Sequence, residues 1–233
     1  MTGAFGRPEA EAVLYTELYD LFVFDLDGTL AETREDLAAS VNYALERLGF
    51  PPRDFQEVTR FIGNGARVLL DRALGPAASP EGIEKGLRIF LEHYGEHCLE
   101  RTFLYPGVEA TLEGLARRGK RFTVLTNKPA AMSRKILERF GVAALFGRID
   151  GGDSFPAKKP DPLGLREHMS LAGASPGRTL MVGDYAVDIE TARAAGARSA
   201  GALWGFKPDE FDGAPPDHFL AKIEDLLGEA SKG

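Results

Sequence analysis

In the stretch Leu21-Phe22-Val23-Phe24-Asp25-Leu26-Asp27-Gly28-Thr29-Leu30, an apolar run ends in two aspartates one residue apart. Four consecutive apolar residues rich in Val and Phe are typical of a buried parallel strand, and the Gly-Thr pair is typical of a turn. Open α/β sheets bind ligands beyond the carboxyl ends of their strands. Carboxylates this close repel each other unless a divalent cation lies between them or one of them holds a proton. Metal-dependent chemistry at a sheet edge is therefore the first hypothesis.

Strands and helices alternate in the second part of the chain, after Tyr105-Pro106-Gly107. Hydrophobic periodicity predicts helices over 108–118, 130–140, 161–172 and about 186–195. It predicts strands over Arg121–Leu125, near Gly147–Asp150, over Arg178–Val182 and over Ser199–Leu203. Such alternation indicates an α/β fold with a doubly wound, Rossmann-like parallel sheet.

The chain between the first strand and this alternating part is expected to be all-helical. Helical patterns occupy 33–48, 54–61, 66–74 and 80–99, and no convincing strand is expected between residues 31 and 102. We therefore predict an α/β core formed by residues 1–32 and 103–233, and a helical cap, 33–102, inserted after the first strand. An insert at that point lies over the carboxyl-end face of the sheet, as a lid does.

Composition narrows the class of protein. The net charge is −7, from 28 basic and 35 acidic residues, and no basic run stands out, which argues against a nucleic-acid partner. The single cysteine, Cys98, permits no intrachain disulfide, as is usual in a reducing compartment. No signal peptide and no apolar run long enough to span a membrane are recognisable. We expect a cytoplasmic protein without a membrane partner.

Three further polar groups follow predicted strands or precede the next helix: Thr126-Asn127-Lys128, Lys158-Lys159-Pro160, and Gly183-Asp184 with Asp188. Each group has an ordinary alternative when viewed alone: a strand-to-helix turn, solvated charge and a helix N-cap, respectively. Together, however, they can converge with Asp25 and Asp27 on one edge of a parallel sheet. Carboxylates are hard oxygen donors suited to Mg²⁺, and a lysine with a hydroxyl-amide pair suits a phosphoryl group.

The chain resembles the haloacid dehalogenase superfamily of aspartyl-nucleophile phosphatases. The segment Asp25–Leu30 is similar to its first motif, Thr126-Asn127 to its second, Lys159 before Pro160 to its third and Gly183–Asp188 to its fourth. The resemblance covers about residues 20 to 230, helical cap included.

Within this superfamily the chain is similar to the phosphoglycolate phosphatase group. The phrases that carry this similarity also occur in several related phosphatases; they are Tyr105-Pro106-Gly107, Thr126-Asn127-Lys128-Pro129, Lys159-Pro160-Asp161-Pro162 and Gly63-Asn64-Gly65.

The resemblance implies a role for each motif residue. Asp25 would be the nucleophile that forms an aspartyl-phosphate, and Asp27 would be the general acid and later the base. The Asp25 carboxylate, the Asp27 backbone carbonyl and Asp184 would hold Mg²⁺, with Asp188 binding directly or through one water. The phosphoryl oxygens would be held by Thr126, the Asn127 backbone and Lys159.

Several cap residues and motifs have two interpretations. Gly63 and Asn64 suggest a loop that closes over the substrate, while Arg34 and Arg67 could bind a substrate carboxylate or be exposed helix residues. The glycine-rich Gly63-Asn64-Gly65 lacks the third glycine of a dinucleotide loop. The spelling His93-Tyr94-Gly95-Glu96-His97 matches a zinc-peptidase motif, although no third ligand is evident and a polar helix face explains it.

We therefore predict a Mg²⁺-dependent phosphatase that acts on a small phosphomonoester, with phosphoglycolate as the first substrate. The second aspartate, Asp27, argues against a dehalogenase, since a halide leaving group needs no proton, but it does not exclude a phosphosugar mutase. A phosphatase of a sugar phosphate or of pyrophosphate stays open, as does a non-catalytic phosphoacceptor or binding module. The expected partner is a small phosphorylated metabolite, and the protein is expected to be a monomer or a homodimer.

Overall fold

A computed structural model describes residues 14–76, 78–207, 211 and 215–228 of the chain. Its main sheet is parallel throughout, in the order β5-β4-β1-β6-β7-β8. The strands are β1 (Leu21–Phe24), β4 (Arg121–Leu125), β5 (Ile149–Asp150), β6 (Thr179–Gly183), β7 (Arg198–Ala202) and β8 (His218–Leu220). The central strand β1 lies between β4 and β6, with Phe24 in register with Val124 and Val182. The loops after these three strands therefore leave the sheet side by side.

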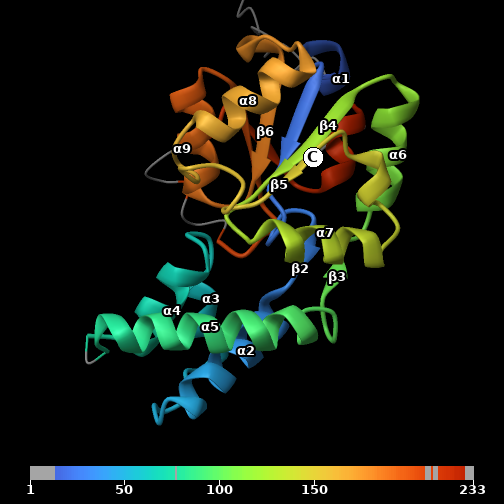
Figure 1. Cartoon of the computed structure of the whole chain (residues 1–233). Coiled ribbons are helices and arrows are strands. Elements are labelled where there is room, and N and C mark those ends of the chain that lie inside the picture. The colour runs from blue at the N-terminus through green and yellow to red at the C-terminus, as the bar shows by residue number, and fades with distance from the viewer. Residues whose placement is uncertain (1–13, 77, 208–210, 212–214, 229–233) are drawn as a thin grey trace, which may run out of the picture.

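Helices cover both faces of the sheet. Consecutive side chains of β1 point to opposite faces, and since all of them are apolar, both faces need to be covered. Phe22 and Phe24 belong to one hydrophobic cluster, and Leu21 and Val23 belong to another. The first cluster also contains side chains of α1 (Tyr15–Leu18), α6 (Val108–Arg117), α7 (Ala130–Arg139) and the 3₁₀ segment η4 (Ile223–Leu227). The second contains side chains of α8 (Leu163–Ala172) and α9 (Ala186–Ala195). The result is the doubly wound arrangement that the alternating pattern predicts (Figure 1). Two further 3₁₀ segments are η1 (Ala143–Leu145) and η2 (Pro176–Arg178).

The inserted segment folds into a separate group of helices below the sheet in Figure 1. These are α2 (Arg34–Arg47), α3 (Phe55–Phe61), α4 (Ala66–Leu74) and α5 (Pro80–His97). The long helix α5 packs against both α2 and α4. Side-chain caps begin two of the helices: Asp54 accepts a hydrogen bond from Glu57 N (2.7 Å), and Ser79 accepts one from Gly82 N (3.1 Å).

Two very short strands join the core to this insert. The strands β2 (Ala31–Glu32) and β3 (Phe103–Leu104) pair antiparallel, with Ala31 opposite Leu104 and Glu32 opposite Phe103. The chain therefore enters and leaves the helical insert at adjacent points.

The α/β fold class with an inserted helical cap is confirmed, and the strand expected over Arg121–Leu125 has those bounds. Other ends shift by one or two residues: β6 ends at Gly183, and α8 begins at Leu163.

Sequence reasoning missed β2, β3, β8 and the four-residue helix α1. Helix α1 lies in the predicted lead-in, of which residues 1–13 are outside the described residues. The domain boundaries at 32/33 and 102/103 stay a prediction. Within the described ranges, no helix has both the length and the apolar character that crossing a membrane requires.

Candidate active site

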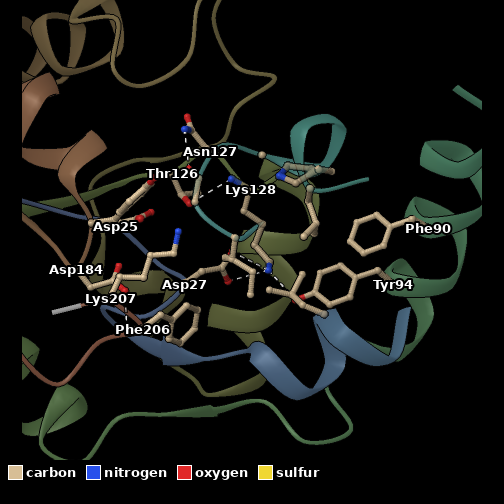
Figure 2. A pocket seen from close by; sticks show the side chains of 18 residues that line it. Asp25, Asp27, Phe90, Tyr94, Thr126, Asn127, Lys128, Asp184, Phe206 and Lys207 are labelled. Atoms are coloured by element: carbon tan, nitrogen blue, oxygen red, sulfur yellow. Dashed lines mark hydrogen bonds and ion pairs between the residues drawn. The ribbon is translucent and has the colours of Figure 1, made fainter. Parts of the chain in front are cut away.

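The strand-end groups singled out in the sequence meet at one edge of the sheet. Asp25 follows β1, Thr126 and Asn127 follow β4, and Asp184 follows β6. A single pocket between the core and the cap is lined by all four, together with Asp27 (Figure 2). Because β1, β4 and β6 are parallel neighbours, residues separated by more than a hundred positions in the chain lie around the same space.

Three carboxylates form a buried cluster in this region. Ligand oxygens of Asp25, Asp184 and Asp188 all lie within 4.8 Å of one another, and the residues are only 6%, 2% and 0% exposed. Burial raises the pKa of Asp184 well above its usual value, and the charges of Asp25 and Asp188 raise it further. Burial likewise raises the pKa of Asp188, although Lys159 opposes the shift. Asp188 Oδ2 is buried and has no hydrogen-bond partner among the described residues. This set of hard oxygen donors fits a divalent cation such as Mg²⁺.

Lys159 supplies a positive charge beside the carboxylate cluster. Its Nζ lies 3.0 Å from Asp25 Oδ1 and 2.6 Å from Asp188 Oδ1, and its side chain is 1% exposed. Burial alone would lower the pKa of Lys159, but the carboxylates of Asp188 and Asp25 raise it above its usual value. The ammonium group therefore stays charged, and it can neutralise a further anion that approaches Asp25.

Asp27 has a different environment from Asp25, although only one residue separates them. Its Oδ1 accepts hydrogen bonds from Thr33 Oγ1 (2.7 Å) and from Lys128 Nζ (2.8 Å), and its Oδ2 lies 3.1 Å from the same ammonium. The side chain of Asp27 is not part of the three-carboxylate cluster. These contacts orient the Asp27 carboxyl group toward the cap side of the pocket, where Figure 2 shows it beside Lys128.

The loop after β4 contributes hydroxyl and amide groups. Thr126 Oγ1 accepts a hydrogen bond from Lys128 N (3.3 Å). Asn127 Nδ2 donates to the carbonyls of Lys159 and of Gly63, each at 3.0 Å, so it joins two core loops to the cap. Asn127 Oδ1 is buried without a hydrogen-bond partner in the described part of the chain.

The cap is closed over the pocket. Lys158 Nζ donates to Asn64 O (2.6 Å), and Lys207 Nζ donates to Arg60 O (2.9 Å). Gly63 has φ +118° and lies against the ring of Tyr185, so that an added Cβ would be 2.6 Å from Tyr185 Cδ1. This position admits no side chain while the cap is closed, which explains the glycine in the Gly63-Asn64-Gly65 loop.

Neither of the two candidate arginines lines the pocket. Arg34 forms an ion pair with Glu32 (2.5 Å), and its guanidinium lies 4.8 Å from the centroid of the Phe206 ring. Arg67 forms an ion pair with Glu84, and its side chain is 54% exposed. Each arginine thus already has a carboxylate partner from the protein itself.

Sequence reasoning missed several residues that line the pocket. They are Phe90, Tyr94, Phe206 and Lys207, which are labelled in Figure 2, and Tyr185. Lys128 also lines the pocket; the sequence grouped it with Thr126-Asn127 but gave it no role of its own. Tyr94 and Phe90 look like ordinary residues of an apolar helix face. Lys207 lies beyond the last strong motif and carried no signal.

The alternative motifs have structural explanations. The ring of His93 stacks on His97 (4.2 Å) and on Tyr43 (4.1 Å), and its Nδ1 is 2.9 Å from Ser40 Oγ. Within the described residues, the one group of three or more side chains placed to hold a metal is that of Asp25, Asp184 and Asp188, and it contains no histidine.

Comparison with known proteins identifies the family of the chain. The family described as haloacid dehalogenase-like hydrolase matches residues 22–202 of the chain. A protein named phosphoglycolate phosphatase 1 from Pseudomonas aeruginosa is 41% identical over 84% of this chain and 74% of its own length. A phosphoglycolate phosphatase from Aquifex aeolicus is 35% identical over 89% of this chain and 94% of its own. A crystal structure titled as a predicted phosphoglycolate phosphatase, from Haemophilus somnus, superposes with a TM-score of 0.85 at 35% identity, covering 90% of this chain and 97% of that one.

Proposed function

The chain belongs to the haloacid dehalogenase-like hydrolase family, and on that premise we propose that it is a phosphatase that hydrolyses phosphoglycolate through an acyl phosphate on Asp25. The relatives named above are phosphoglycolate phosphatases, and they supply the first choice of substrate. The chemistry is supported by the pocket itself, which places two aspartates in contrasting environments.

That contrast is the observation that carries the proposal. Asp25 lies within the buried carboxylate cluster and 3.0 Å from the Lys159 ammonium, so it faces positive charge and is suited to attack as an anion. Asp27 lies outside the cluster and is oriented by Thr33 and Lys128, as a group that transfers protons must be. Two carboxylates with two environments thus give a nucleophile and a proton-transfer group.

In the first step, a carboxylate oxygen of Asp25 attacks the phosphorus atom of the bound phosphomonoester. The bond between phosphorus and the leaving oxygen breaks, and Asp27 donates its proton to that oxygen, so the alcohol leaves neutral.

In the second step, the carboxylate of Asp27 takes a proton from a water molecule. The water oxygen bonds to phosphorus, the bond between phosphorus and Asp25 breaks, and inorganic phosphate leaves. Asp25 is regenerated as a carboxylate, and the proton on Asp27 is available for the next turnover.

We assign the carboxylates of Asp25, Asp184 and Asp188, with the backbone carbonyl of Asp27, to a Mg²⁺ site. When bound, the ion supplies the positive charge that lets an anionic nucleophile approach an anionic phosphoryl group. We assign Thr126, the backbone of Asn127 and the Lys159 ammonium to the phosphoryl oxygens, a division of labour in which positioning and charge neutralisation do most of the catalysis.

The alternative functions differ in the products that they would give. A phosphosugar mutase returns the phosphoryl group to a second hydroxyl and releases little phosphate. A phosphatase of another metabolite would release phosphate fastest from a sugar phosphate or from pyrophosphate. A non-catalytic phosphoacceptor would become labelled on Asp25 without turnover, and the oriented Asp27 argues against it, since a phosphoacceptor needs no group to protonate an alcohol.

We further propose that the enzyme works in the cytoplasm, as a monomer or a homodimer, on a small phosphorylated metabolite and without nucleic acid or membrane. The net charge of −7 and the single cysteine support this setting. Light scattering of the purified protein and fractionation of cells that express it would test these two points.

The experiment that tests the main proposal is phosphate release from a panel containing phosphoglycolate, sugar phosphates and pyrophosphate. We expect phosphoglycolate to give the highest kcat/KM with Mg²⁺ present. Asp25→Asn should abolish turnover and also the acid-stable covalent label left by radioactive substrate, whereas Asp71→Asn, the same change at an exposed cap position, should not. Normal turnover by Asp25→Asn would refute the assignment of the nucleophile.

A further inference from the structure

The pocket holds an unusual pair of polar side chains on the cap side of Asp27. Lys128 Nζ donates to Tyr94 OH (2.6 Å) and lies 4.5 Å from the centroid of the same ring. The Lys128 side chain is 2% exposed, and Tyr94 is 1% exposed and stacks on Phe90 with ring centroids 5.4 Å apart. A buried ammonium and a buried phenol are thus held firmly together at the wall of the pocket.

The rest of the cap wall is apolar. Among the described cap residues that line the pocket, Tyr94 has the one polar side chain, and the large neighbours are Leu37, Ile62, Leu69 and Phe90. A leaving group with several hydroxyls would place them against these aliphatic and aromatic side chains and leave them unpaired, which is costly. The wall therefore favours a short leaving group with its polar atoms gathered near Lys128 and Tyr94.

The two side chains can serve a ligand in different ways. The Lys128 ammonium has three hydrogens, and its described hydrogen bonds go to Asp27 Oδ1, Asp27 Oδ2 and Tyr94 OH, so what it offers a ligand is its positive charge. Tyr94 OH accepts from Lys128, and within the described part of the chain its own hydrogen is not donated to any acceptor. Burial raises the pKa of Tyr94 well above its usual value, so the phenol stays protonated. A positive charge and a neutral hydrogen-bond donor therefore lie together at the pocket wall.

The position of this pair relative to Asp27 defines what it can bind. The proton of Asp27 goes to the leaving oxygen, so that oxygen lies within hydrogen-bond distance of Asp27, on the side where Lys128 Nζ is 2.8 Å from Asp27 Oδ1. An anionic group one carbon away from the leaving oxygen would therefore meet Lys128 and Tyr94.

We propose that Lys128 and Tyr94 form the subsite that selects a carboxylate attached one carbon from the phosphate ester oxygen, the arrangement found in 2-phosphorylated hydroxy acids. This inference rests on the phosphatase function proposed above and deepens it, because it assigns substrate selection to two named side chains. It replaces Arg34 and Arg67, which the sequence suggested for this role and which, unlike Lys128 and Tyr94, do not line the pocket.

Paired substrates give the direct test. Phosphoglycolate and ethyl phosphate have leaving groups of similar length, and only the first carries a carboxylate. The measured quantity is the ratio of kcat/KM for phosphoglycolate to kcat/KM for ethyl phosphate. We expect a high ratio in the wild type, a fall of about tenfold to a hundredfold in Lys128→Met, and a smaller fall in Tyr94→Phe, since a charged hydrogen bond contributes more than a neutral one. The fall should appear mainly in KM for phosphoglycolate.

Lys207→Met is the matched control. Lys207 lines the same pocket, but its Nζ donates to Arg60 O in the cap and lies 4.0 Å from the centroid of the Tyr185 ring. Its loss should affect both substrates alike through the cap contact, so the ratio should be preserved. If Lys128→Met fails to fold, Tyr94→Phe alone decides, because it keeps the ring and removes only the hydroxyl.

Two results would overturn the subsite. One is a wild type with no preference for phosphoglycolate over ethyl phosphate; the other is a proportional loss on both substrates in Lys128→Met and Tyr94→Phe, which would mean that the pair only orients Asp27. Neither result touches the phosphatase function, which fails on a different outcome, namely no phosphate release from either substrate by the wild type.

Discussion

The α/β core and the helical cap contribute different kinds of groups to the pocket. The core supplies charged side chains to the lining, such as Asp25 and Asp184, on loops that follow parallel strands, and Lys159 contacts Asp25. The cap contributes apolar side chains and the Tyr94 hydroxyl, and its Gly63 and Asn64 carbonyls accept hydrogen bonds from core side chains. Charge chemistry requires fixed distances, which the sheet edge supplies, whereas shape and closure can be supplied by a separate group of helices. Changes at the carboxylate cluster and Lys159 should therefore alter the rate of the chemical step, whereas changes in the cap, or at the core residue Lys128 that contacts it, should alter binding and closure.

The largest contrast is expected between two adjacent lysines. Lys159 contacts the carboxylates of Asp25 and Asp188 in the core, and Lys158 contacts Asn64 O of the cap. Lys159→Met should lower kcat by about 10²–10³-fold, as the loss of a group that stabilises transition-state charge does. Lys158→Met should change kcat/KM by less than about tenfold, the worth of one hydrogen bond. Steady-state kinetics on both variants makes the comparison, and equal losses in kcat would erase the distinction between core and cap.

The second contrast concerns the carboxylate cluster and uses stability as the readout. Mg²⁺ at about 100 times its Kd should stabilise the wild type by about 2.7 kcal/mol, raising Tm by about 5–10 °C. Asp184→Asn should be more stable than the wild type without metal, because one of three mutually repelling buried carboxylates is neutralised, and it should lose most of the gain from Mg²⁺. Differential scanning calorimetry with and without a chelator measures both effects.

Asp71→Asn is the control for this comparison, since it neutralises an exposed carboxylate on α4 and should retain the full Mg²⁺ effect. A wild type whose Tm does not respond to Mg²⁺ would contradict the metal site.

The third contrast isolates cap closure. Gly63→Ala places a Cβ against Tyr185, whereas Gly49→Ala meets nothing within 4 Å, and both glycines have positive φ, +118° and +79°. Both variants should lose stability from the backbone conformation, by about 1 kcal/mol or somewhat more. Only Gly63→Ala should raise KM, by about tenfold, because the closed cap no longer fits. Thermal unfolding together with kinetics separates the two effects, and an unchanged KM in Gly63→Ala would show that closure does not depend on this contact.

The smallest effect is expected inside the cap. Asp54→Ala removes the N-cap of α3, whose carboxylate accepts from Glu57 N at 2.7 Å, at a cost of about 1 kcal/mol. Amide hydrogen exchange should quicken in α3 while β1 keeps its protection. If β1 amides exchange faster to the same extent, the cap and the core unfold as one unit and the two regions are not energetically separate.

The sequence predicts the core better than the cap, for physical reasons that particular residues illustrate. Buried parallel strands such as β1 and β4 are short apolar runs followed by loops, and Asp25 and Thr126 stand out because polar side chains at strand ends have a restricted set of uses. The strands β2 and β3 contain two residues each, too short for any periodicity to show. β8, with three residues, is also too short.

Cap residues escape prediction because their function depends on tertiary contacts. Tyr94 lies on the apolar side of α5, and only its distance to Lys128 distinguishes it from a core tyrosine. Arg67 and Arg34 were reasonable candidates from side-chain chemistry, but Glu84 and Glu32 are near enough to pair with them. Which carboxylate an arginine meets is decided by packing, and a linear pattern does not contain that information.

The antiparallel pairing of β2 with β3 has a consequence for the evolution of this fold. Because Ala31 pairs with Leu104, the two ends of the roughly 70-residue insertion lie side by side where they leave the sheet domain, as the two ends of a hairpin loop do. The inserted segment can be lengthened, shortened or exchanged at little cost, because the loop-closure entropy depends only weakly on its length. The strand order of the sheet is not affected. Proteins built on this junction can acquire new substrates by exchanging the inserted helices, while the reacting residues of the core stay the same.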